Sequence, residues 1–190
     1  MTLRIKAFWI FLLVAALQLL APASMIYQQE TTLSRGVPYR FKTAPIDPYD
    51  PFRGRYVRLN VEAGSTPVAA DAALKKGQWA YVLLGKDEQN FATLKHAYRE
   101  PPAVGDYLRL KVRSAYNDSV SLKMPFDRYY AEESIAPEIE RAYRNSARRG
   151  RQDAFVMARV KDGRGVIEEL YIEDLPILEF LARESAQEHQ

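Results

Sequence analysis

The apolar segment at the N-terminus constrains this chain most. Residues 7–20 are almost wholly apolar, and they follow the basic residues Arg4 and Lys6. Basic residues keep the adjoining end of a hydrophobic segment in the cytoplasm. Residues 1–26 are therefore predicted to be a transmembrane anchor or an export signal, which places residues 27–190 on the far side of the membrane.

The same segment fits two topologies. A spanning helix needs about 20 apolar residues to cross the hydrocarbon core, and residues 7–26 just reach that length. A cleavable signal ends in small residues spaced as A-x-A, which Ala21-Pro22-Ala23 matches loosely. We favour an anchor that holds the chain in the membrane through residues 7–26, although the residues alone leave cleavage open.

The remainder of the chain is almost neutral. All 24 acidic residues lie beyond residue 26, and so do all 27 basic residues except Arg4 and Lys6, which leaves a net charge of +1. Nucleic-acid binding needs a basic surface that displaces counterions, so we expect no nucleic-acid partner. Because the chain has no cysteine, disulfides, thiolate metal sites and cysteine nucleophiles are excluded, and stability must come from a hydrophobic core.

Alternation of apolar and polar residues dominates from Tyr39 onward and predicts strands. The predicted strands cover residues 39–43, 55–62, 78–85, 91–98, 106–113 and 119–124. A last hairpin turns at Asp162-Gly163. One helix is predicted between Ser134 as N-cap and Gly150, and a short helix over residues 175–185 ends the fold.

Strands this close together predict a mainly β fold with one packed helix (α+β). We expect an antiparallel sheet or barrel-like sandwich behind a single N-terminal transmembrane helix. The predicted division is 1–26 as anchor, 27–38 as spacer, 39–185 as one extracytoplasmic β-rich domain and 186–190 as a frayed tail.

The segment 44–62, APIDPYDPFRGRYVRLNVE, places two Asp-Pro pairs directly before a predicted strand. Proline keeps the preceding residue out of the helical region, and the side chains of Asp47 and Asp50 can lock turns by accepting bonds from nearby amides. Gly54 permits a bulge where the strand begins. Calcium or magnesium would need more oxygen ligands than two carboxylates, so turn locking is the favoured interpretation and no metal site is predicted.

The strand pattern occurs twice, because G-x-Y-[VL]-R-L-[NK]-V fits both residues 54–61 and residues 105–112. Each copy places a tyrosine and an arginine two residues apart on one face, close enough for ring and guanidinium to stack. The favoured interpretation is a repeated start of a half-exposed strand. The alternative is a binding face made of Asp47, Asp50, Arg53, Gly54, Tyr56 and Arg58, with Tyr107 and Arg109 as its extension.

The segment 44–61 resembles the signature of the GDYXXLXY family, bacterial membrane-anchored proteins of unknown function. The matching residues are Pro45, Asp47, Pro48, Asp50, Arg53, Gly54, Tyr56 and Leu59. Arg55 stands where the family has Asp, and Val61 where it has the last Tyr. The similarity continues through residues 126–134 to the last hairpin. It implies an uncleaved anchor in the bacterial inner membrane, a periplasmic or extracellular domain and a multi-spanning membrane protein as partner.

The predicted helix carries a second candidate surface. Four arginines project opposite its apolar face: Arg141, Arg144, Arg148 and Arg151. Cations near a helix C-terminus interact favourably with the helix dipole, which is the favoured explanation. The alternative is a patch that binds anionic headgroups or an acidic partner.

Catalytic chemistry has weaker support, because no serine lies in a G-x-S-x-G motif. A membrane-anchored hydrolase would have to use a Ser–Lys pair such as Ser121 and Lys123, or the carboxylates of Asp47 and Asp50. This is the alternative to our main hypothesis, a non-catalytic accessory protein that binds a membrane protein or an envelope component without a cofactor.

Overall fold

The computed structural model describes residues 2–44, 56–61, 65–69, 73–116, 118–126, 128–148 and 153–188. The helices are α1 (Thr2–Arg35), α2 (Ala136–Arg148) and α3 (Ile177–Glu188). The strands are β1 (Val37–Ala44), β2 (Tyr56–Arg58), β3 (Asn60–Val61), β4 (Ser65–Pro67), β5 (Trp79–Lys86), β6 (Ala92–Tyr98), β7 (Tyr107–Tyr116), β8 (Ser119–Lys123), β9 (Arg128–Tyr130), β10 (Ala154–Lys161), β11 (Arg164–Ile172) and β12 (Leu175–Pro176).

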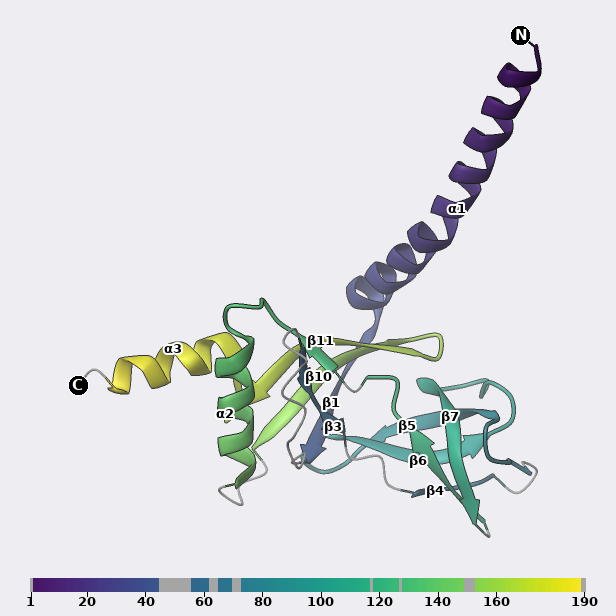
Figure 1. Cartoon of the computed structure of the whole chain (residues 1–190). Coiled ribbons are helices and arrows are strands. Elements are labelled where there is room, and N and C mark those ends of the chain that lie inside the picture. Colours follow the sequence, from purple (N-terminus) through teal and green to yellow (C-terminus); the bar gives the residue numbers. More distant parts are fainter. Residues whose placement is uncertain are drawn as a thin grey trace.

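The 34-residue helix α1 continues almost directly into the first strand (Figure 1). It ends at Arg35 and β1 begins at Val37, so the polar residues after the apolar segment continue the helix. The N-terminal part of α1 projects away from the rest of the molecule, and its large apolar side chains are exposed. By length and composition α1 could cross a membrane, as an anchor or as a signal sequence.

A five-stranded antiparallel sheet with the order β12-β11-β10-β1-β3 forms one half of the domain. Its hairpin β10–β11 places Lys161 opposite Arg164. The two residues between them, Asp162 and Gly163, have φ values of 49° and 79°. Positive φ at both positions is the type I′ geometry that follows the twist of the strands. The predicted Asp-Gly hairpin turn is confirmed.

The other half is a small antiparallel barrel with the strand order β4-β8-β7-β5-β6. Its two edge strands meet and nearly close the sheet. Ala69 N donates to Ala97 O at 3.0 Å, and Thr66 Oγ1 donates to Leu94 O at 3.0 Å. The antiparallel sheets, the barrel and the packed helix confirm the predicted α+β fold class.

The two halves share one hydrophobic core. The tip of the β10–β11 hairpin lies beside β7, where Arg109 N donates to Gly163 O at 2.7 Å. Gly163 has no room for a side chain, because a Cβ at this position would lie 2.9 Å from Tyr107 Cε2. The hydroxyl of Tyr39 on β1 donates to Asp106 Oδ2, just before β7, at 2.9 Å. Both contacts join the sheet to the barrel.

The predicted strand over residues 55–62 is divided into two short strands. β2 pairs with β9, whereas β3 pairs with β1. The break falls at Leu59, which is 2% exposed. Its side chain fills the core at the point where the chain leaves β9 and begins to pair with β1. The second copy of the repeat continues unbroken from Tyr107 to Tyr116 as β7. The two copies therefore lie in different sheets.

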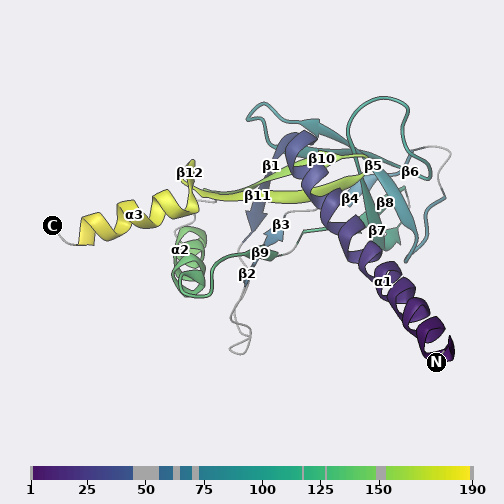
Figure 2. The same ribbon diagram turned by 90° about the horizontal axis from the view of Figure 1, so that it is seen from above.

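The helices α2 and α3 cover one end of the five-stranded sheet (Figure 2). The side chains of Ile139, Ala142 and Tyr143 are at most 4% exposed, which confirms the predicted apolar face of α2. The helix α3 extends to Glu188, three residues beyond the predicted end at residue 185.

The start of α2 differs from the prediction by one residue. A turn precedes the helix, because the Glu132 carbonyl accepts bonds from both Ile135 N and Ala136 N. Helical bonding begins at the carbonyl of Ile135, which accepts Ile139 N at 3.1 Å. Ile135, and not Ser134, therefore stands at the cap position.

Candidate functional site

An open groove of about 410 Å³ lies where α1 meets the β-domain. One wall is the end of α1, another is β9 with the residues before it, and the third is β11. We call it the α1 groove and define it by Gln29, Phe126, Arg128, Tyr130, Val166 and Ile167. Aromatic, aliphatic and charged side chains line it together, so it suits a partner with both apolar and polar groups.

The strand that follows the Asp-Pro segment borders this groove. β2 pairs with β9, with Tyr56 opposite Tyr130 and Arg58 opposite Arg128. The other predicted residues of the binding face lie outside the described residues: Asp47, Asp50, Arg53 and Gly54. The side chains of Tyr56 and Arg58 are outside the description as well. Their part in a binding face stays a prediction.

Arg159 fastens the end of α1 to the sheet. Its Nε and Nη2 donate to the Glu168 carboxylate at 2.7 and 2.8 Å, and its Nη1 donates to the Gly36 carbonyl at 3.3 Å. Gly36 N in turn donates to Thr32 O at 2.9 Å and closes the last turn of α1. Exposed ion pairs add little stability, but the bidentate geometry of the Arg159–Glu168 pair fixes the orientation of the guanidinium. The helix therefore leaves the sheet in a defined direction.

Tyr129 holds β9 against β11. Its hydroxyl donates to Glu169 Oε1 at 2.7 Å, and Leu170 N donates to the same oxygen at 2.9 Å. Burial and the hydrogen bond to Glu169 raise the pKa of Tyr129 well above its ordinary value. The phenol therefore stays neutral and positions the strand. The next residue, Tyr130, is 70% exposed, so the two tyrosines face opposite sides of β9.

We expect stability to fall as the pH rises from about 10 to about 12, because two tyrosines are held neutral in the fold. Burial and the hydrogen bond to Asp106 raise the pKa of Tyr39 to about 12, and the pKa of Tyr129 is raised as well. Above about pH 10 the unfolded chain loses these protons while the folded chain keeps them. Urea unfolding at about pH 8 and about pH 11 measures the loss.

The control is the double variant Tyr39→Phe with Tyr129→Phe. It should be less stable at neutral pH, because Asp106 and Glu169 lose a hydrogen-bond donor. It should also lose less free energy of unfolding between the two pH values than the wild type. An equal loss in both proteins would contradict the assignment of the pH effect to these phenols.

Tyr107 and Arg109 lie on the outside of the barrel, in a different sheet from β2. The guanidinium of Arg109 lies over the ring of Trp79, 4.7 Å from its centroid. Tyr107 meets Tyr81 edge-on with ring centroids 5.8 Å apart. Arg109 therefore stacks on a ring of the neighbouring strand β5 rather than on Tyr107, and the extension of the binding face to this pair stays a prediction.

The predicted arginine patch is described only in part. Arg141 is exposed on α2 and Arg144 is half-buried. Arg148 ends α2, but its side chain and the whole of Arg151 lie outside the described residues. The C-terminal end of α2 is on the side of the domain away from α1 (Figure 1). Its role as a binding patch for headgroups or an acidic partner stays a prediction.

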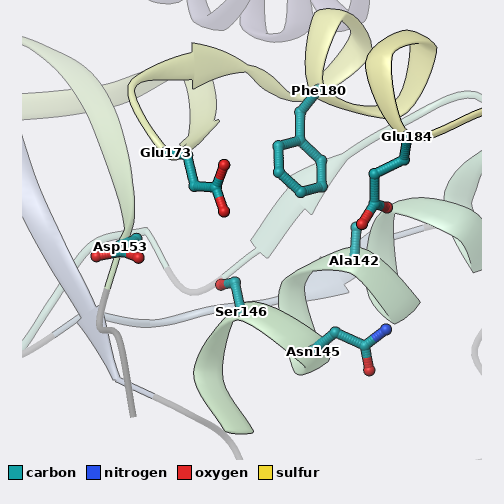
Figure 3. A pocket seen from close by; sticks show the side chains of 7 residues that line it. All are labelled: Ala142, Asn145, Ser146, Asp153, Glu173, Phe180 and Glu184. Atoms are coloured by element: carbon teal, nitrogen blue, oxygen red, sulfur yellow. The ribbon is translucent and has the colours of Figure 1, made fainter. Parts of the chain in front are cut away.

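Figure 3 shows a small hollow beside α2 and α3. The carboxylates of Asp153, Glu173 and Glu184 surround it together with the hydroxyl of Ser146. The space is about 10 Å³, which is room for about one water molecule, and Glu173 is already bonded to Arg183. The hollow is too small for a substrate. Among the described residues, no group of three His, Asp or Glu side chains could hold a metal ion.

The Ser–Lys pair lies on the barrel strand β8. Ser121 is half-buried and Lys123 is exposed. A lysine that acts as a catalytic base must be desolvated, and an exposed Lys123 remains in water. Within the described part of the chain, this pair lacks the environment of a hydrolase site.

A sequence model of the GDYXXLXY protein family matches residues 18–170. The chain belongs to the GDYXXLXY family. No curated protein and no solved structure gives a significant match. The GDYXXLXY match begins within α1 and ends in β11, so it includes the α1 groove and the barrel.

The GDYXXLXY signature has a partial second copy in this chain. Residues 105–107 read Gly-Asp-Tyr and Leu110 stands at the position of the signature leucine. Asp106 thus supplies the acid that Arg55 replaces in the first copy. Its carboxylate accepts the Tyr39 hydroxyl, so in this copy the acid joins the barrel to the sheet. The acid of the second copy therefore has a structural role, whereas β2 of the first copy pairs with a strand that lines the groove.

Proposed function

We propose that this GDYXXLXY protein is a single-pass, non-catalytic accessory protein of the bacterial cell envelope. Residues 7–26 anchor it in the inner membrane, and residues 39–185 form one domain outside the cytoplasm. Arg4 and Lys6 support this orientation, because basic residues stay on the cytoplasmic side. The domain binds a multi-spanning membrane protein through the α1 groove.

The position of the groove on α1 is the observation that carries this proposal. A helix of 34 residues is about 50 Å long, and the hydrocarbon core is about 30 Å thick. The apolar part ends at Ile26, so Gln29, which lines the groove, lies only about 5 Å further along the axis. The groove then opens beside the headgroups, within reach of the loops of a neighbouring membrane protein.

The rigid junction supports the same function. Thr32 is 3% exposed, and Arg159 links the Gly36 carbonyl to Glu168. A flexible tether would let the domain sample many orientations, whereas this junction holds the groove at one height and one direction. A preorganised surface loses less entropy when it binds.

Photo-cross-linking in native membranes tests the proposal. A photoreactive amino acid at Gln29 or Val166, both on the groove, should give a discrete adduct with a membrane protein that peptide sequencing identifies. The matched control is the same group at Gln187, an exposed residue of α3, which should give little or none. The proposal fails if the groove positions give no adduct above the level at Gln187.

A further inference from the structure

The barrel strands carry charge of one sign. β5, β6, β7 and β8 contain no Asp or Glu. Their charged residues are Lys86, Lys95, Arg109, Lys111, Arg113 and Lys123. The chain beyond residue 26 is nearly neutral, so the fold concentrates on the barrel a positive charge that the domain as a whole lacks.

Aromatic rings share the outer surface of the barrel with these cations. Trp79 is 50% exposed, and the guanidinium of Arg109 lies over its ring. Tyr81 and Tyr107 are half-buried and meet edge-on. Because each ring is held by a neighbour, the surface is preorganised for a ligand.

Strand pairing places rings and cations in rows across the barrel. Trp79 lies opposite Lys111, and Lys111 lies opposite Lys123. In the next row, Tyr81 lies between Arg109 of β7 and Tyr98 of β6. Neighbouring strands are about 4.8 Å apart, so each row extends about 10 Å over three strands. We define the cationic-aromatic face as Trp79, Tyr81, Tyr98, Arg109, Lys111 and Lys123.

The cations of this face have no acidic partner in the described part of the chain. The side chains of Arg109, Lys111 and Lys123 take part in no ion pair or hydrogen bond there, apart from the contact of Arg109 with Trp79. Asp162, at the hairpin tip beside β7, is paired with Lys161. The positive charge is therefore available to a ligand from outside.

We propose that the cationic-aromatic face binds an anionic polysaccharide. The apolar face of a sugar ring packs on an aromatic ring, and the carboxylate or phosphate groups of such a polymer pair with Arg and Lys. Alternating rings and cations match a polymer that repeats sugar and charge. The inference rests on the proposed function, because it needs the domain to lie outside the cytoplasm, where such polymers occur.

Direct binding to the purified full-length chain in detergent tests this proposal. The probe is polygalacturonate, an unbranched polymer of a uronic acid, and the measurement is thermophoresis. We expect saturable binding that weakens as salt rises from about 50 to about 300 mM. Lys111→Glu should weaken binding about tenfold, whereas Arg183→Glu should leave it unchanged, because Arg183 is exposed on α3, away from this face, and is already paired with Glu173.

Two further arms separate sugar recognition from simple charge attraction. Trp79→Ala should weaken binding of polygalacturonate but not of polyglutamate, which carries carboxylates without sugar rings. Absence of binding would overturn the proposal, as would equal losses with Lys111→Glu and Arg183→Glu. Tighter binding of polyglutamate would mean that the face takes an acidic polypeptide instead. None of these outcomes depends on cross-linking at the α1 groove, so the two proposals fail separately.

Discussion

Replacement of Gly36 by alanine should lower the free energy of unfolding by about 2–3 kcal/mol, because there is no space for a side chain at the junction. A Cβ on Gly36 would lie 2.4 Å from Thr32 O and 3.1 Å from Val160 N. Both contacts are with backbone atoms, which cannot rotate away. The end of α1 must therefore shift relative to β10, and the contact from Arg159 to the Gly36 carbonyl is lost. Urea unfolding in detergent measures the change.

Limited proteolysis checks that the damage is local. Trypsin cleaves after arginine, so cleavage at Arg35 should be faster in Gly36→Ala than in the wild type. The control is Gly77→Ala, where an added Cβ has nothing within 4 Å and only the φ of +87° causes strain. That variant should lose about 1 kcal/mol and keep Arg35 protected. Similar cleavage at Arg35 in both variants would contradict a local effect of Gly36→Ala on the junction.

Leu108→Ala should cost roughly 3 kcal/mol, because the side chain is fully buried where the barrel meets the hairpin. Its Cδ2 lies 3.0 Å from the position that a Cβ on Gly165 of β11 would occupy. A cavity at this point weakens the barrel and the sheet together. With Trp9 replaced by Phe, tryptophan fluorescence reports on Trp79 in the barrel. The unfolding midpoints of this fluorescence and of far-ultraviolet circular dichroism should therefore fall by the same amount.

The control for this variant is Leu178→Ala on α3, since Leu178 is 54% exposed. It removes the same atoms and should change the free energy of unfolding by less than about 0.5 kcal/mol. If the fluorescence midpoint of Leu108→Ala falls while the circular dichroism midpoint stays, the two halves unfold independently. The proposal that residues 39–185 form one domain would then be wrong.

Local sequence patterns predict the elements of this fold well. Alternating apolar residues marked the strand that contains Leu108 and Leu110, both fully buried. The Asp-Gly pair predicted the hairpin turn, because its preference for positive φ acts within two residues. Both signals depend only on neighbouring residues along the chain. The start of α2 was predicted one residue too early. A turn closed by hydrogen bonds to the Glu132 carbonyl precedes the helix.

The candidate sites could be predicted only in part. The Tyr–Arg repeat indicated Tyr107 and Arg109, but their partners, Tyr81 and Trp79, lie on another strand. The link from Arg159 to Glu168 was missed because a bulge after Met157 shifts the register of the hairpin. Register is a property of the strand pair and has no signature in either strand alone.

The amino-acid sequence by itself determined the apolar helix that could anchor the chain, the family and the positions of most strands, because composition and periodicity act within short segments. Tertiary structure decided which strands are neighbours. Pairing of β2 with β9 and packing of β11 under the end of α1 build the groove, and pairing of β5 with β7 gathers rings and cations on the barrel. These contacts join residues that are far apart in the chain, so they exist only once the core has brought them together.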